Sequence, residues 1–72
     1  MTMDGIMNVV RSAGKVTRKE MAEVYAKAIQ IEVGYIDWPI LNRAIMDRWS
    51  RSGLRFIKER AWRIVEQAKR SV

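Results

Sequence analysis

The chain has 72 residues, of which 49% are hydrophobic and 31% charged, and its formal net charge is +6. It contains neither Cys nor His, which excludes a disulfide framework, a thiolate metal site and the usual agents of acid–base catalysis near neutral pH. The apolar share is too high for a disordered chain. We therefore expect residues 1–72 to form a single folded domain.

The net positive charge of the chain comes from its C-terminal part. Residues 1–42 carry five basic and five acidic side chains, whereas residues 43–72 carry nine basic and three acidic ones and so account for the whole net charge of +6. These basic residues alternate with apolar ones at regular intervals, which is not typical of a disordered tail. The pattern predicts a folded cationic face that suits a polyanion, first of all nucleic acid.

The expected location is intracellular and cytoplasmic. Asp4 precedes the first apolar residues, so the N-terminal segment does not resemble a secretion signal. No apolar run approaches the roughly 20 residues that a membrane span requires. We expect no membrane partner.

The first predicted helix follows Thr2 and stops at Gly14, a residue type that commonly ends helices. Its apolar residues recur at helical spacing: Met3, Ile6, Met7, Val10 and Ala13.

The second predicted helix begins with a capping box, in which Thr17 and Glu20 bond each other's backbone N–H groups. Val16 is placed to pack onto Met21, and Gly34 is placed to end the helix. The apolar stripe consists of Met21, Val24, Tyr25, Ala28 and Ile29.

The third predicted helix has Asp37 as its N-cap and Pro39 in its first turn, with Ile36 placed to pack onto Leu41. Its apolar face comprises Leu41, Ala44, Ile45 and Trp49.

A break is expected at Ser50–Gly53. At 100° per residue, Leu54 falls well outside the preceding stripe, so one straight helix would turn part of its apolar surface to water. After the break, a fourth helix of about 18 residues is predicted. Its apolar arc comprises Leu54, Ile57, Ala61, Ile64, Val65 and Ala68. The fold class is therefore all-α, a small bundle of three to four helices.

Residues 39–61 resemble the helix-turn-helix of DNA-binding regulators. The resemblance is carried by Ala44, Trp49, Ser50, Arg51, Ser52, Leu54 and Ile57. It implies a helix-turn-helix-like pair in the C-terminal half, in which the second helix is the recognition helix. The chain departs from the family at Arg43 and Asp47, where apolar residues are preferred, and at Arg48, where Gly is preferred.

The resemblance implies that Arg51, Ser52, Arg55, Phe56 and Glu59 face the DNA groove. Helical spacing independently places Arg51, Arg55, Phe56, Glu59 and Arg63 away from the apolar arc. Arg can bond guanine or phosphate, and a Ser hydroxyl at a helix N-terminus suits phosphate. The candidate nucleic-acid-binding residues are Arg51, Ser52, Arg55, Phe56, Lys58 and Arg63.

Some of these side chains also allow other interpretations. Glu59 could pair with Arg63, and Glu66 with Arg70, on a solvated helix face. Phe56 could stack on a base, pack in a dimer or rest against the first helix, and packing is favoured over stacking.

Other residues have structural interpretations. Trp38, Trp49 and Trp62 are expected in the core or at its edge. Arg48 and Glu32 could form a partly buried pair.

The predicted function is that of a non-enzymatic DNA-binding regulator or accessory protein. Two alternatives stay open: a small interaction module that docks a basic helix on an acidic protein, and an RNA-binding protein. No metal site, other cofactor or catalytic residue is expected. A homodimer or larger assembly is expected, because a chain this short has a marginal core and one short recognition helix gives little specificity.

Overall fold

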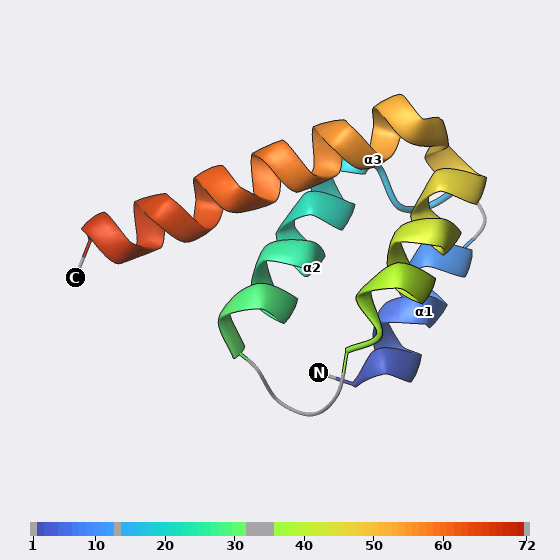
Figure 1. Ribbon diagram of the computed structural model, residues 1–72, viewed down its shortest axis with the longest axis horizontal. Helices are drawn as coiled ribbons and strands as arrows, with labels where there is room; N and C mark the ends of the chain where they lie inside the picture. The colour runs from blue at the N-terminus through green and yellow to red at the C-terminus, as the bar shows by residue number, and fades with distance from the viewer. Residues whose placement is uncertain (1, 13, 32–35, 72) are drawn as a thin grey trace.

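The computed structural model describes residues 2–12, 14–31 and 36–71, and within these residues the fold is all-α. It contains three helices, α1 (Met3–Arg11), α2 (Arg18–Ile31) and α3 (Trp38–Arg70) (Figure 1). The described residues include no strand. The all-α class predicted from the sequence is confirmed.

Helix α1 begins as its sequence predicts, because the Thr2 hydroxyl accepts a hydrogen bond of 3.1 Å from the Gly5 N–H. Ile6 and Val10 are its buried residues. The helix ends at Arg11, and Ala13 lies outside the described residues. Gly14 then has φ 68°, a left-handed conformation that glycine adopts without steric cost.

Helix α2 begins with the predicted capping box. The Thr17 hydroxyl accepts from the Glu20 N–H at 3.2 Å, and the Glu20 carboxylate accepts from the Thr17 N–H at 3.3 Å. Met21, Tyr25 and Ala28 are buried, as the apolar stripe predicts. The expected stop at Gly34 falls outside the described residues.

The first turn of α3 also follows the sequence pattern. The Asp37 carboxylate accepts from the Ile40 N–H at 3.2 Å, and Pro39 occupies the first turn, where its missing N–H costs nothing. Leu41 and Ile45 are fully buried.

Helix α3 is broken at Ser50, inside the predicted segment. Ser50 has φ 70° and ψ 176°, which interrupts the helix between a first arm (residues 38–49) and a second arm (residues 51–70). The Ser50 hydroxyl accepts from the Gly53 N–H at 3.5 Å and so caps the second arm. The break takes one residue, and the ribbon bends sharply there (Figure 1).

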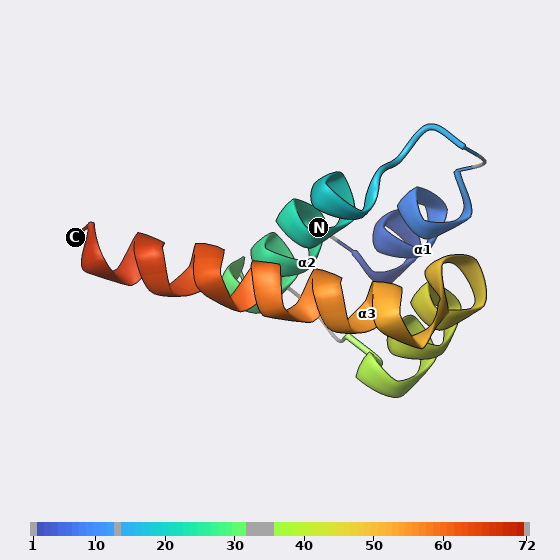
Figure 2. The same ribbon diagram turned by 90° about the horizontal axis from the view of Figure 1, so that it is seen from above.

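The two arms cover different parts of the molecule. The first arm runs beside α1, and the second arm crosses α2 and extends past it (Figure 1). Figure 2 shows α1 and the first turns of α2 on the same side of α3. The largest fully buried side chains come from all three helices: Ile6, Met21, Leu41, Ile45 and Ile57.

The C-terminal turns of the second arm leave the core. Ile57, Ala61 and Val65 are buried as predicted, but Ala68 is exposed, so its placement in the core was wrong. The helical periodicity continues to Ala68, but the last turns of the arm lie beyond α2 (Figure 1). Among the described residues, no helix covers Ala68.

Candidate nucleic-acid interface

The second arm presents all six predicted binding residues to solvent. Its opposite side is buried in the core through Gly53, Ile57, Ala61 and Val65. The six exposed residues are Arg51, Ser52, Arg55, Phe56, Lys58 and Arg63. The amphipathic pattern therefore placed the candidate site on the accessible side of the helix.

The acidic residues on this side are too few to balance its basic residues. The second arm carries seven exposed basic residues, namely Arg51, Arg55, Lys58, Arg60, Arg63, Lys69 and Arg70, against the exposed Glu59 and Glu66. We call these seven residues the basic face. Its local surplus of positive charge nearly equals the net charge of the whole chain.

Glu59 pairs with Arg55. The Arg55 Nε lies 3.2 Å from the Glu59 Oε1, and the two side chains are 82% and 60% exposed. The alternative pairing of Glu59 with Arg63 is not formed, and no ion pair joins the described residues Glu66 and Arg70. An exposed pair is worth only about 0–1 kcal/mol, so a phosphate or a base edge can compete with Glu59 for Arg55.

Phe56 contacts the guanidinium group of Arg18, a residue of α2. The Arg18 guanidinium carbon lies 5.2 Å from the Phe56 ring centroid, and the ring stays 37% exposed. The expected alternatives were a base, a dimer partner or the first helix. The residue found over the ring instead belongs to the first turn of α2.

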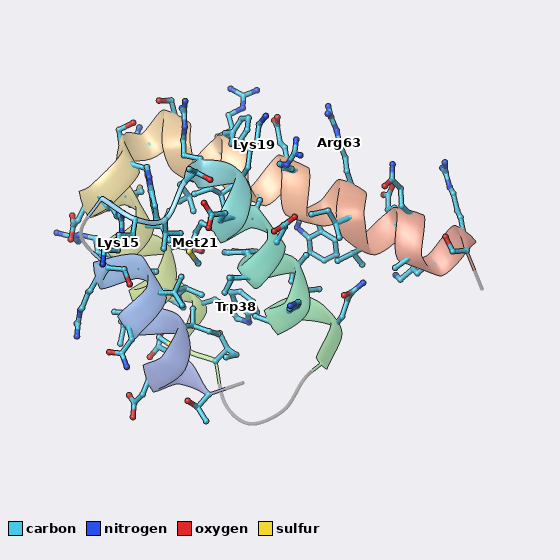
Figure 3. All side chains as sticks on the ribbon, turned by 180° about the vertical axis from the view of Figure 1, so that it is seen from behind. Lys15, Lys19, Met21, Trp38 and Arg63 are labelled. Carbon is cyan, nitrogen blue, oxygen red and sulfur yellow. The ribbon has the colours of Figure 1, made fainter. Side chains whose placement is uncertain are left out.

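The first turn of α2 adds cations that the sequence reasoning missed. Arg18 lies against Phe56, and Lys19 and Arg63 project at the same edge of the molecule (Figure 3). Residues 1–42 are neutral as a group, so a charge count along the chain gives no sign of this cluster. The signal appears only when α2 is packed on the second arm.

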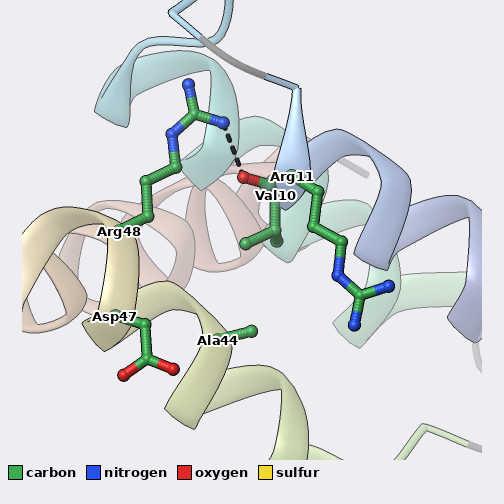
Figure 4. Close-up of a pocket in the computed structure, with 5 residues that line it drawn as sticks. All are labelled: Val10, Arg11, Ala44, Asp47 and Arg48. Carbon is green, nitrogen blue, oxygen red and sulfur yellow. Dashed lines mark hydrogen bonds between the residues drawn. The ribbon is translucent and has the colours of Figure 1, made fainter.

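Arg48 has a structural role between the helices. Its guanidinium donates a hydrogen bond to the carbonyl oxygen of Val10 (Figure 4). It donates a second one to the carbonyl oxygen of Val16 at 3.2 Å. It also lies 4.4 Å from the Trp49 ring centroid. Glu32, the expected partner, lies outside the described residues. Arg48 is therefore engaged by backbone carbonyls that the helical wheel could not place beside it.

The three tryptophans have different environments. Trp38 and Trp49 are half-buried, as expected, and the Trp38 ring lies 5.1 Å from that of Tyr25. Trp62 is 48% exposed, so of the two expected positions, the core and its edge, the core is wrong. It follows the buried Ala61 by one residue, a rotation of 100° that carries the indole out of the core.

A polar pair lies beside these aromatic residues. The Tyr25 hydroxyl donates to the Asn42 Oδ1 at 2.9 Å and joins α2 to the first arm of α3. Burial raises the pKa of the Tyr25 phenol.

No family model, no curated protein and no solved structure matches this chain. Within residues 2–12, 14–31 and 36–71, no three acidic side chains gather as metal ligands would. None of the helices in those ranges has the length and apolar character needed to cross a membrane.

Proposed function

We propose that the protein is a non-enzymatic DNA-binding regulator or accessory protein that contacts DNA through the second arm of α3. The observation that carries this proposal is the basic face itself. Seven exposed cations share one helix with two exposed carboxylates, while the other side of the helix is fixed in the core. A rigid helix with such a charge distribution suits the phosphates that flank a DNA groove.

The break at Ser50 supports a helix-turn-helix-like use of the two arms. It allows the first arm to pack beside α1 while the second arm takes another direction, with Arg51 and Ser52 in its first turn. In a recognition helix the N-terminal residues reach base edges. We assign Arg51 and Arg55 to base edges, and Ser52, Lys58 and Arg63 to phosphates.

The cluster at the first turn of α2 extends the proposed contact. Lys19 lies at the same edge as Arg63 (Figure 3), so one DNA backbone could be contacted from two helices. Since a single recognition helix covers few base pairs, we propose that two copies bind two half-sites.

Selection from a randomised DNA duplex tests this function. We expect a short palindromic motif, and Arg51→Ala should relax the preference at one position of each half-site, where a lost bidentate contact costs about 1–3 kcal/mol. Arg43→Ala is the matched control. Arg43 is an exposed arginine of the first arm, paired with Asp47 at 4.0 Å, and its removal should leave the motif intact.

A selection that recovers no motif would contradict the proposed role as a DNA-binding regulator. If the protein then bound random duplex and random RNA equally, its function would be that of a general nucleic-acid-binding protein. If it bound neither but captured an acidic protein in a fixed stoichiometry, it would be an interaction module.

A further inference from the structure

Trp62 lies where three shallow pockets meet. The first is also lined by Arg55, Lys58, Glu59 and Arg63 of the same arm. The second is formed with α2 and the first arm and is also lined by Tyr25, Ile29, Trp38, Asn42 and Lys58. The third is also lined by Ile29, Gln30, Val65 and Lys69. The half-exposed indole therefore has open space around it, and each pocket includes a lysine.

This combination of an open aromatic ring and cations is chemically selective. Lys58 and Lys69 lie about 6 Å and about 10 Å from Trp62 along the helix axis, on opposite sides of it. A flat ring that can stack on the indole, carried by a chain with a negative charge on either side, matches both features. An unpaired nucleotide has this chemistry, whereas the bases of a duplex are stacked on one another and offer no free face.

A second copy of the chain fits this surface poorly. The exposed charges around Trp62 are Arg55, Lys58, Arg63 and Lys69 against Glu59 and Glu66, so the surface is positive. Bringing two such surfaces together would place like charges opposite each other.

We infer that Trp62 is a stacking platform for an unpaired base of single-stranded DNA, with Lys69 on one flanking phosphate and Lys58 on the phosphate at which the open strand joins the duplex. The inference rests on the proposed function, because it uses the same arm of α3 and the same polyanion. It adds that the protein holds a strand whose bases are open, beside the duplex contact made by Arg51 and Arg55.

Fluorescence anisotropy with labelled oligo(dT) and with a random-sequence duplex tests this inference. Trp62→Ala should weaken oligo(dT) binding about 5- to 150-fold, the effect expected of one lost stacking contact. Trp62→Phe should retain most of the affinity, and both variants should bind duplex as the unchanged protein does. Ile40→Ala is the control, since Ile40 is an apolar side chain of the first arm that is 55% exposed. It should leave both affinities unchanged.

Three outcomes would overturn the inference while the proposed function stands. In the first, the protein binds duplex but Trp62→Ala does not change its affinity for oligo(dT). In the second, Trp62→Ala leaves the thermal melt unchanged but lowers the affinities for oligo(dT) and for duplex equally. In the third, sedimentation shows that Trp62→Ala dissociates a dimer. Tighter binding of oligo(rU) than of oligo(dT) would overturn the assignment to DNA. Failure to bind any of these nucleic acids would overturn the proposed function and the inference together.

Discussion

The Arg48 guanidinium donates a hydrogen bond to the carbonyl oxygen of Val10, so a side chain of α3 closes the C-terminal end of α1 (Figure 4). The last carbonyls of a helix have no partner within that helix. α1 has only nine residues and is too short to be stable alone. The contact with Arg48 therefore helps to hold α1 and the segment that follows it.

Removing this contact should destabilise the fold. Arg48→Ala leaves the carbonyls of Val10 and Val16 without their donor, and we expect a loss of about 1–3 kcal/mol in the free energy of unfolding. Arg48→Lys keeps the charge but cannot donate from two separate nitrogens, so it should lose part of the same free energy of unfolding. Urea denaturation measures both variants. Arg43→Ala, which breaks only an exposed ion pair, should change little, and an equal loss from Arg43→Ala would contradict the structural role of Arg48.

A Cβ atom at Gly53 should be poorly tolerated. Gly53 is buried, and a Cβ built on it would lie less than 3.0 Å from the Cβ of Trp49. We expect Gly53→Ala to lower stability by about 1–3 kcal/mol through overpacking, although alanine favours a helix. A thermal melt would test this, with Gln67→Ala, at an exposed position of the same arm, as the control. Stabilisation by Gly53→Ala would mean that the arms form one continuous helix.

The conformation of Ser50 predicts that a substitution there raises the stability, whereas Gly53→Ala lowers it. With φ 70° and ψ 176°, Ser50 occupies a region that is essentially confined to glycine and costs about 1–3 kcal/mol. Ser50→Gly removes that cost and loses only a few tenths of a kcal/mol of capping. The variant should therefore unfold at a higher urea concentration. A lower midpoint would show that the backbone at Ser50 is not strained.

The buried hydroxyl of Tyr25 predicts a dependence of stability on alkaline pH. Because burial raises the pKa of Tyr25 in the folded state, its contribution is complete below about pH 10 and is lost as the pH rises through the folded value. The stability difference between the unchanged protein and Tyr25→Phe should therefore shrink above about pH 10. Urea denaturation across this range measures it, and a difference that stays constant would refute the assignment.

Local signals made much of the fold predictable. Thr17 and Glu20 formed the expected capping box, and Asp37 capped α3. The mismatch at Leu54 placed the helix break within a few residues of Ser50. Each of these signals is read within one or two turns of chain, where side-chain spacing is fixed by helical geometry.

The missed features depend on contacts between elements. Ala68 follows the helical period, but the arm extends past the helix that would cover it. Arg48 donates hydrogen bonds to backbone carbonyls in the N-terminal part of the chain, and Arg18 of α2 lies over the Phe56 ring of α3. Neither partner can be found from spacing along one helix. The exposed candidate residues were predictable, while the contribution of α2 to their surroundings was not.

The salt dependence of duplex binding is the most direct test of the central claim, that the basic face contacts DNA. We predict that log affinity falls steeply with log salt concentration, and that Lys58→Ala and Arg63→Ala each reduce this slope by about one. Lys27→Ala, which removes an exposed lysine of α2 outside the basic face, should leave the slope unchanged. Equal weakening by all three substitutions, or an affinity that does not respond to salt, would contradict the account.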